Sequence, residues 1–493
     1  MASGKFTNQD FFSLGIYDPA LVRRFAAAGK KLIKRNKLTR EETLALFAEL
    51  VNDPQKHLRG EPLVRPLARL LLEQGSQDTG SIKGTPRAGK EPTGRPSPVL
   101  QPKPLYYKVF GKEQIDPESM NQMNTAMRLP VSNAGALMPD AHVGYGLPIG
   151  GVLATDSSYV IPYAVGVDIA CRMCMSVYDL PVHMLADKRD HLRSCLLNNT
   201  TFGVGSANRR HLDTGLFDSE TWRSTRVIRD LKDLAFSQYG TSGAGNHFAE
   251  WGSLEVTAKD ELLQIPPGKY LAVLTHSGSR GFGANICDHY SKIAREKCGL
   301  PKEAQHLSWL NLKSEEGKEY WIAMQLAGRY ASANHHEIHN KIAREMGLQP
   351  IKMLENHHNF AWKDKLPEGP EVIIHRKGAT PAGRDDIGII PGSMATPGFV
   401  VRGKGNASGL NSAAHGAGRV LSRKKAMKSI TFRKMSQTLE KAGVELIGGH
   451  VDEAPEVYKD IHEVMAYQKN LVDVLARFQP VIVRMAEPGR WRK

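Results

Sequence analysis

Five short segments place side chains that could bind a metal ion or attack a phosphorus atom at the ends of apolar runs. The segments are "GVDIACRM" with Asp168 and Cys171, "GTSGAGNHFAEWG" with Asn246, His247 and Glu250, "LTHSGSRG" with His276, "LENHHNFAW" with His357 and His358, and "NSAAHGAGRVLSRKKA" with His415. Any one of these histidines could be structural. Four of them lie beside Gly, Asn or Ser in predicted loops, however, which favours a shared pocket. Thiolate, carboxylate and imidazole differ in softness, so ligand type leaves zinc, manganese, iron and cobalt open.

His415 has almost no side-chain bulk around it, because Ala413, Ala414, Gly416 and Ala417 are its neighbours. Glycine exposes backbone N–H groups, and a basic helix start follows, which suits a phosphorylated ligand. A satisfied structural histidine is the alternative interpretation.

Further cations and backbone amides for phosphate come from "HRKGATPAG", with Arg376 and Lys377, and from "IPGSMATPGFVVRGKG". For the basic run Arg423, Lys424 and Lys425, an exposed and solvated surface is an equal alternative. The chain contains neither a Walker A loop nor a Gly-x-Gly-x-x-Gly in a convincing βαβ unit, which disfavours P-loop and Rossmann folds.

The five cysteines are too few and too scattered for a disulfide framework, which fits a reducing compartment. Cys171 and Cys174 form one Cys-x-x-Cys pair, but no second pair accompanies it. A structural zinc knuckle is therefore weakly supported.

The net charge of +15 and the pI near 9.4 favour a polyanionic partner without separating RNA from DNA or a small phosphorylated substrate. The 493 residues, 41% of them hydrophobic, can build a large packed core. No apolar run approaches the roughly 18 residues of a membrane span, and the first residues lack the pattern of a secretory signal. We therefore expect no membrane partner and a cytoplasmic location.

Composition divides the chain into three parts. Residues 1–74 form an N-terminal extension with helical patterns over residues 19–74, including a Thr39–Glu42 capping box. Residues 75–104 are predicted to be a flexible linker, because Gly, Pro, Ser and Thr dominate up to residue 98. Residues 105–493 alternate strand-like runs such as "KYLAVLTHSG" and "PEVIIHRKGA" with helical stretches, and no regular βαβ repeat appears. The predicted fold class is therefore α+β.

The ordered motifs "MPDAHVGYGLPIGGV", "GVDIAC", "GNHFAE", "HSGSRG", "HHN", "HRKGAT", "IPGSM", "HGAGR" and "DEAPEVYKDI" resemble the RtcB RNA-splicing ligases. The resemblance runs from about residue 109 to about residue 484. It implies a single large catalytic domain after a small helical N-terminal extension. It also implies an enzyme that uses GTP and two manganese ions to join RNA ends bearing a 2′,3′-cyclic phosphate or 3′-phosphate to 5′-hydroxyl ends, in tRNA splicing or RNA repair.

The same resemblance implies roles for individual residues. His415 would attack the α-phosphorus of GTP and become guanylylated. The implied metal ligands are Asp168, Cys171, His247, His276 and His358, with Cys171 bridging the two ions. The implied nucleotide-binding residues are Asn246, Glu250, His358, Asn359, Pro391, Gly392, Ser393, Met394, His415, Gly416, Ala417, Gly418 and Arg484.

Two positions depart from the family pattern. Arg484 stands where relatives commonly carry a lysine at the guanylate site, which puts nucleotide affinity or base selectivity in question. Ala414 precedes His415 where relatives often have Cys or Ser. Two other functions use many of the same residues: a metal-dependent phosphatase or nuclease, and a noncatalytic RNA-binding protein of the same fold. Trapped protein-bound GMP would separate the ligase from the phosphatase or nuclease. A decayed ligand set would favour the noncatalytic protein, and the ligand set of this sequence is intact. An activating protein partner is left open.

Overall fold

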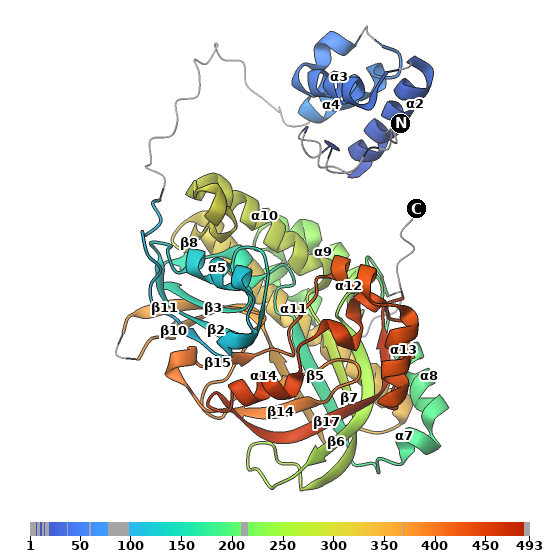
Figure 1. Ribbon diagram of the computed structural model, residues 1–493, viewed down its shortest axis with the longest axis vertical. Helices are drawn as coiled ribbons and strands as arrows, with labels where there is room; N and C mark the ends of the chain where they lie inside the picture. Colours follow the sequence, from blue (N-terminus) through green and yellow to red (C-terminus); the bar gives the residue numbers. More distant parts are fainter. Residues whose placement is uncertain are drawn as a thin grey trace. The chain divides into compact units, whose positions relative to one another are not determined.

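The computed structural model of the chain describes residues 6, 10–11, 14, 19–36, 38–58, 61–76, 98–208, 215–367 and 369–487 (Figure 1). The chain forms two compact units, Met1–Arg95 and Pro96–Lys493. Most of the predicted linker, residues 77–97, lies outside the described residues.

The first unit is built from helices α2 (Pro19–Asn36), α3 (Arg40–Asn52) and α4 (Arg65–Ser76), with a 3₁₀ turn at Pro54–His57. The predicted capping box is confirmed, because the Glu42 N–H donates to Thr39 Oγ1 (3.1 Å) and the Thr39 N–H donates to Glu42 Oε2 (2.7 Å). Phe25, Phe47 and Leu50 are fully buried in its core.

The second unit contains an eight-stranded sheet in the order β13 (Ile387–Ile390), β14 (Gly398–Gly403), β17 (Val472–Met485), β6 (Phe248–Val256), β7 (Gly268–Ser277), β5 (Arg172–Tyr178) and β9 (Lys352–His357), with β16 (Glu445–Ile447) paired to β17. The two outermost strands in this order, β13 and β9, come together, so the sheet is curled. The Asn356 side chain of β9 accepts from the Ile389 N–H of β13 (3.0 Å) and donates to the Ile389 carbonyl (3.4 Å). Met175, Leu274 and Val400 belong to one apolar cluster of the sheet.

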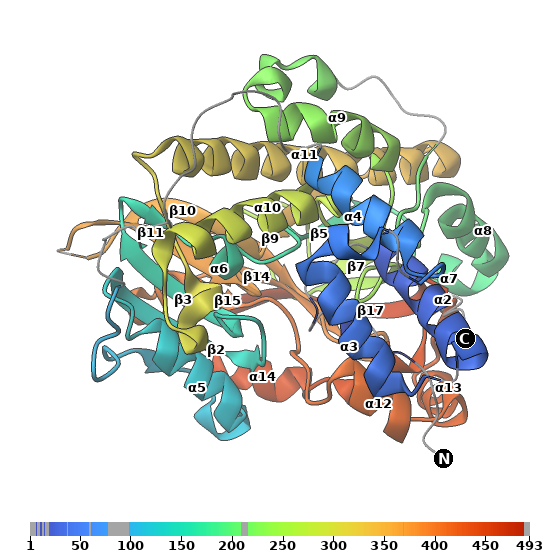
Figure 2. The same cartoon turned by 90° about the horizontal axis from the view of Figure 1, so that it is seen from above.

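Helices cover one face of this sheet (Figures 1 and 2). The described helices of this layer are α8 (Arg189–Asn199), α9 (Arg226–Gln238), α10 (Arg280–Cys298) and α11 (Glu315–Met346). Leu196 of α8 and Ile338 of α11 cluster with Trp251 and Val273 of the sheet. Phe282 of α10 and Tyr330 of α11 cluster with one another, so α10 packs against α11.

A second sheet has the order β1 (Lys108–Val109), β2 (Ser132–His142), β3 (Ile149–Asp156), β11 (Glu371–Lys377) and β10 (Asn359–Lys365). Two short pairs join β12 (Ala379–Pro381) to β15 (Ser412–Ala414) and β4 (Tyr159–Val160) to β8 (Leu310–Asn311). The remaining helices are α5 (Pro117–Ala126), α6 (Pro162–Val165), α7 (Met184–Asp187), α12 (Arg423–Ser429), α13 (Phe432–Lys441) and α14 (Ile461–Tyr467), with short 3₁₀ turns between elements.

Nearly all strand pairs are antiparallel, the exceptions being β1 with β2 and β16 with β17. Helices gathered on one face of antiparallel sheets define an α+β fold, which confirms the predicted fold class. Within the described residues, no helix combines the length and the apolar character needed to cross a bilayer.

Candidate active site

Strand register brings the predicted metal ligands to one end of the large sheet. In the antiparallel ladder Met173 pairs with His276, His276 pairs with Phe248, and Arg172 pairs with His357. Four strand ends therefore meet: the starts of β5 and β6 and the ends of β7 and β9. Cys171 and His358 come together there, although more than 180 residues separate them in the sequence. Each ligand lies at, or a few residues outside, a strand end.

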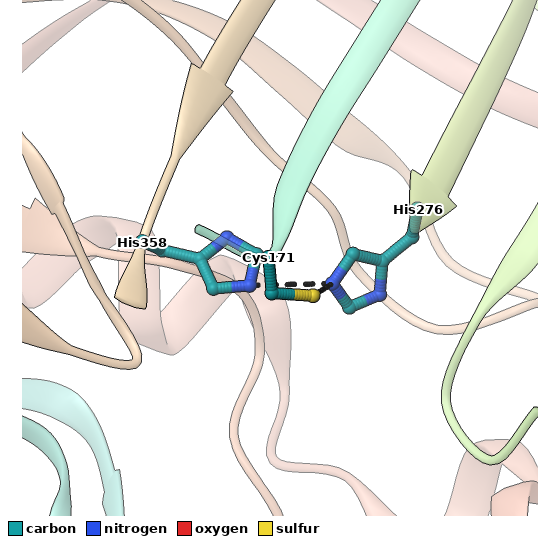
Figure 3. A group of neighbouring side chains, drawn as sticks. All are labelled: Cys171, His276 and His358. Carbon is teal, nitrogen blue, oxygen red and sulfur yellow. Dashed lines mark hydrogen bonds between the residues drawn. The ribbon is translucent and has the colours of Figure 1, made fainter. Parts of the chain in front are cut away.

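Cys171, His276 and His358 converge there (Figure 3). Cys171 Sγ lies 3.1 Å from His276 Nε2, which lies 3.2 Å from His358 Nε2. The Nδ1–H of His276 donates to the Asn246 carbonyl (3.0 Å), so its Nε2 has a free lone pair. Burial lowers the pKa of His276 and His358 well below the usual range, which keeps both rings neutral. Neutral imidazoles with converging Nε2 atoms suit a metal ion.

Asp168, Cys171 and His247 form a second group that shares the same thiol. His247 Nε2 lies 3.2 Å from Asp168 Oδ2 and 3.3 Å from Cys171 Sγ. Without a cation an Nε2 proton of His247 can donate to Asp168. His247 Nδ1 faces both the Ser242 carbonyl (3.0 Å) and the Arg280 guanidinium (3.0 Å), which can only donate. A bound cation would therefore replace the Nε2 proton only in the tautomer whose Nδ1–H donates to Ser242.

The charges of this cluster also fit a cation. Burial alone would raise the pKa of Asp168, but the hydrogen bond from His247 and the positive charges of His247 and Arg280 hold it well below the usual range. Burial and the Asp168 charge raise the pKa of the Cys171 thiol well above its usual value. A divalent ion in contact with the sulfur would reverse that shift and favour the thiolate. The donor set therefore matches a metal centre that shares Cys171 between two groups.

Close packing fixes the position of Asp168. Its Oδ1 accepts from the Ser279 N–H at 3.0 Å. A Cβ at Gly278 would lie 2.3 Å from the same oxygen, so only glycine permits this approach. Asn359 Nδ2 donates to the Asp168 carbonyl (3.1 Å), and Asn359 Oδ1 accepts from the Gly378 N–H (2.8 Å).

His415 follows β15 directly and lies beside the metal-binding cluster, with its ring centroid 4.9 Å from that of His358. Its Nδ1–H donates to Asp140 Oδ2 at 2.6 Å, and its backbone N–H donates to the same oxygen at 3.1 Å. Asp140 is fully buried. A carboxylate that holds Nδ1–H leaves the lone pair on Nε2 free, which is the tautomer that a nucleophilic histidine needs.

Asp140 is itself held by its surroundings. Lys459 donates to the carbonyls of Pro139 (2.9 Å) and Ala141 (2.8 Å), on either side of it. A Cβ at Gly418, where φ is +73°, would lie 2.0 Å from the Asp140 carbonyl oxygen. Gly418 therefore allows the turn after His415 to approach β2 closely, and the small residues of this turn leave room for a ligand.

The two clusters share a cavity of about 1160 Å³. Its lining includes every residue assigned above to the nucleophile, the metal or the nucleotide except Arg484: Asp168, Cys171, Asn246, His247, Glu250, His276, His358, Asn359, Pro391, Gly392, Ser393, Met394, His415, Gly416, Ala417 and Gly418. The histidines lie less exposed than a loop position suggests, since His247, His276 and His358 have at most 4% of their surface exposed.

Part of the cavity lining is apolar and contains one carboxyl group. Met394, Val483 and Met485 belong to one apolar cluster, with Phe248 packed against it. Glu250 lies two residues after Phe248, lines the cavity, and has its pKa raised well above the usual range by burial. A neutral carboxyl group can both donate and accept a hydrogen bond, which suits a polar planar ring.

Arg484 lies on the other face of the sheet. Its guanidinium donates to the Leu196 carbonyl in the last turn of α8 and lies 5.6 Å from the centre of the Phe202 ring. A bulge in β17 between Pro480 and Ile482 explains this, because one extra residue reverses which side chains face inward. Val483 and Met485 line the cavity in its place.

Three other candidate residues are separated from the cavity. Arg376 donates to Ser412 Oγ (2.8 Å) and lies 4.6 Å from the centre of the Trp362 ring, in a second cleft that His357 also lines. Cys174 is fully buried in β5. Among the described residues, both candidate metal-binding groups include Cys171, and neither includes Cys174. Lys377, by contrast, lines the main cavity, as do Arg423 and Lys425, whereas Lys424 does not.

Asp140 and Lys459 are site residues that reasoning from the sequence did not single out. Both lie in quoted motifs, "MPDAHVGYGLPIGGV" and "DEAPEVYKDI". The available signal for Asp140 is a carboxylate directly after the apolar run "GALMP". Its partner His415 is 275 residues away, so spacing could not reveal the pair.

Known proteins resemble the chain over this whole region. The family described as tRNA-splicing ligase RtcB matches residues 122–234 and 218–486. The RNA-splicing ligase RtcB of Escherichia coli K12 is 30% identical over 398 residues, covering 75% of this chain and 94% of the relative. The RNA-splicing ligase RtcB of Mycobacterium tuberculosis H37Rv is 30% identical over 429 residues, covering 73% and 99%. The tRNA-splicing ligase RtcB of Thermococcus kodakarensis is 29% identical over 433 residues, covering 73% and 89%.

The matched residues include all the cavity residues named above, and the class of protein they define is the RNA-splicing ligases. Within that class the chain belongs to the RtcB family. The resemblance seen in the nine motifs and the expectation of an RNA ligase are both confirmed.

Proposed function

We propose that this ligase uses GTP and two manganese ions to join RNA ends bearing a 2′,3′-cyclic phosphate or 3′-phosphate to 5′-hydroxyl ends, through a guanylylated His415. The observation that carries the proposal is the Asp140–His415 pair beside a thiol, carboxylate and imidazole cluster in one cavity. A role in tRNA splicing or RNA repair and a cytoplasmic location remain predictions.

His415 supplies the nucleophile in this proposal. Its Nε2 lone pair forms a bond to the α-phosphorus of GTP, and the bond from that phosphorus to the bridging oxygen breaks, releasing pyrophosphate. The Nδ1–H stays with Asp140 throughout. The imidazole gains positive charge as the P–N bond forms, and the buried Asp140 carboxylate stabilises that charge.

The metal ligands support two ions because Cys171 belongs to both three-residue groups. Asp168 and His247 would hold one ion, and His276 and His358 the other, with Cys171 between them. Bound ions would neutralise phosphate charge on GTP and on the RNA end. Buried thiol and imidazole donors also accept other divalent metals, so manganese itself rests on the family resemblance.

The cavity lining supports a nucleotide. We propose that Glu250, Ser393 and Met394 contact the guanine, because a buried neutral carboxyl group lies near apolar side chains there. Lys425, which is exposed and forms no ion pair within the described residues, brings positive charge to the same cavity, where RNA phosphates would enter. Lys377 and Arg423 also line it, bonded to the Tyr145 carbonyl and to Asp452 and Glu453 respectively. Arg484 takes no part in these contacts, because its guanidinium caps α8.

One experiment separates this function from its alternatives. Wild-type protein is incubated with manganese and GTP labelled at the α-phosphate and then analysed by denaturing electrophoresis. We expect an acid-labile protein-bound label that His415→Ala lacks. A His415→Ala protein labelled at the wild-type rate would refute the assignment of the nucleophile. RNA cleavage or phosphate release without any label would favour a phosphatase or nuclease, and neither activity would favour a noncatalytic RNA-binding protein.

A further inference from the structure

An exposed tyrosine lies at the mouth of the cavity. Tyr145 lines the cavity, yet 69% of its surface is exposed, and it lies in the loop between β2 and β3. Val143 and Val167 line the same cavity and are each 49% exposed. The polar interior thus has an aromatic and aliphatic rim.

The rim loop is held in place although it is exposed. Gln122 receives a hydrogen bond from the Gly144 N–H (3.0 Å) and donates to the Gly144 carbonyl (2.6 Å). The next carbonyl, that of Tyr145, accepts from Lys377 Nζ. The Tyr145 ring meets His306 edge-on, with centroids 6.0 Å apart. An aromatic ring whose backbone is fixed loses little freedom when a ligand stacks on it.

Two consecutive residues, Lys377 and Gly378, connect Tyr145 to the proposed nucleophile His415. Lys377, which bonds its carbonyl, precedes Gly378 at the end of β11. A Cβ at Gly378 would lie 3.1 Å from His415 Cε1. RNA whose terminal phosphate reaches His415 and the candidate metal ligands can therefore place its last nucleotides near this rim.

We propose that Tyr145 is a stacking platform for the base of a terminal RNA nucleotide. This rests on the proposed ligase function. A base offers a flat π-face to an exposed aromatic ring, and stacking of this kind tolerates any base, which suits an enzyme that joins ends of differing sequence. Lys425, an exposed lysine of the cavity lining, complements the RNA backbone, whereas an apolar protein segment would have to bury its charge.

The first test separates the RNA step from the nucleotide step. Tyr145→Ala is expected to raise the KM for RNA in ligation by about 5- to 100-fold with a small change in kcat, because the base no longer stacks on an aromatic ring. Tyr145→Phe keeps the ring and should restore a KM within about twofold of wild type. Tyr106→Ala is the matched control, since Tyr106 is 86% exposed and does not line the cavity.

The second test uses RNA that lacks a base. Two RNAs are compared, one abasic at the 3′-terminal nucleotide and one at the 5′-terminal nucleotide. Wild-type protein should bind less tightly to the RNA that lacks the stacking base, and Tyr145→Ala should not lower the affinity for that RNA any further. If Tyr145→Ala lowers the affinity for both abasic RNAs as much as for intact RNA, or leaves the KM for intact RNA unchanged, the platform is refuted. Covalent guanylylation needs no RNA, so wild-type protein that fails to guanylylate would refute the proposed function separately.

Discussion

The thiol of Cys171 contacts imidazoles on both sides, His247 at 3.3 Å and His276 at 3.1 Å. Replacing it with serine substitutes a hard hydroxyl for a thiolate that both groups share. Cys171→Ser should therefore lose most bound manganese and guanylylation together, as measured by elemental analysis and GTP labelling. Cys174→Ser is the matched control, because Cys174 lies outside both groups, and it should keep both properties. Full manganese occupancy in Cys171→Ser would contradict the shared ligand.

Asp140 acts on the chemistry only through His415. Asp140→Asn keeps a hydrogen-bond acceptor for Nδ1–H but removes the charge that stabilises the imidazole as it becomes cationic. We expect guanylylation to slow by about 100-fold or more, with manganese content unchanged. Asp179→Asn is the control, because Asp179 is exposed, and it should label at the wild-type rate. A labelling rate in Asp140→Asn within about threefold of wild type would show that this carboxylate does not position the nucleophile.

At the scale of elements, the placement of Arg484 is the clearest gap between sequence and structure. The convergence of the candidate ligands was predictable, because each local apolar run ends in a polar residue and strand ends meet in antiparallel sheets. The side on which Arg484 lies depends on one bulged residue in β17, which no local pattern marks. Asp140 was hidden for a different reason, because its partner His415 is 275 residues away and follows a strand of a different sheet.

Arg484 should therefore matter for stability more than for GTP. Its guanidinium bonds a carbonyl in the last turn of α8, where a cation also favours the helix dipole. Arg484→Met is expected to lower the free energy of unfolding by about 1–2 kcal/mol in urea titrations. The KM for GTP in guanylylation should stay within about twofold of wild type. A raised KM without loss of stability would instead return Arg484 to the nucleotide site.

His375 in β11 is hydrogen-bonded on both sides in its neutral form. We therefore expect the stability of the fold to decrease in acid. Its Nε2 accepts from the Ile161 N–H (2.9 Å), just before α6, and its Nδ1–H donates to the Leu153 carbonyl in β3 (3.2 Å). Burial lowers the pKa of His375 from 6.5 to about 4. Between pH 6.5 and about 4, His375 is therefore protonated in the unfolded chain but neutral in the folded chain. This difference lowers the stability as the pH falls from 6.5 to about 4, by about 3 kcal/mol in total.

Urea unfolding between about pH 7 and pH 4 measures this effect. His375→Gln should be less stable at neutral pH, but its stability should fall less steeply with acid, by up to about 1.4 kcal/mol per pH unit. His183→Gln is the control, because the His183 side chain is 67% exposed. Parallel curves for wild type and His375→Gln would show that another group dominates the acid sensitivity.

At the scale of the whole molecule, the proposed active-site residues lie in the second unit, whereas the N-terminal residues carry an excess of positive charge. Every proposed ligand and the nucleophile lie within Pro96–Lys493. Residues 1–98 carry 17 Lys and Arg against 10 Asp and Glu. The basic residues of α2 include Arg24, Lys30, Lys31 and Lys34, which are exposed and form no ion pair within the described part of the chain. Helix α2 itself contains no acidic residue. We predict that residues 1–98 gather RNA by contacts with its phosphates, the alternatives being a solvated helical appendage and a docking module for another protein.

Deleting residues 1–98 should leave self-guanylylation intact, because none of the proposed site residues is removed. RNA binding should weaken mainly at low salt, and the slope of log K against log salt should become shallower by about 0.7 for each RNA phosphate that the truncated chain no longer neutralises. Lys30→Glu with Lys34→Glu in the full chain should shift the slope in the same direction, whereas Lys302→Glu, an exposed lysine of the second unit, should not. A folded truncation that no longer labels with GTP would show that these residues support the chemistry. Equal RNA affinity of the full and truncated chains across the salt series would exclude the gathering role and favour a docking surface for another protein.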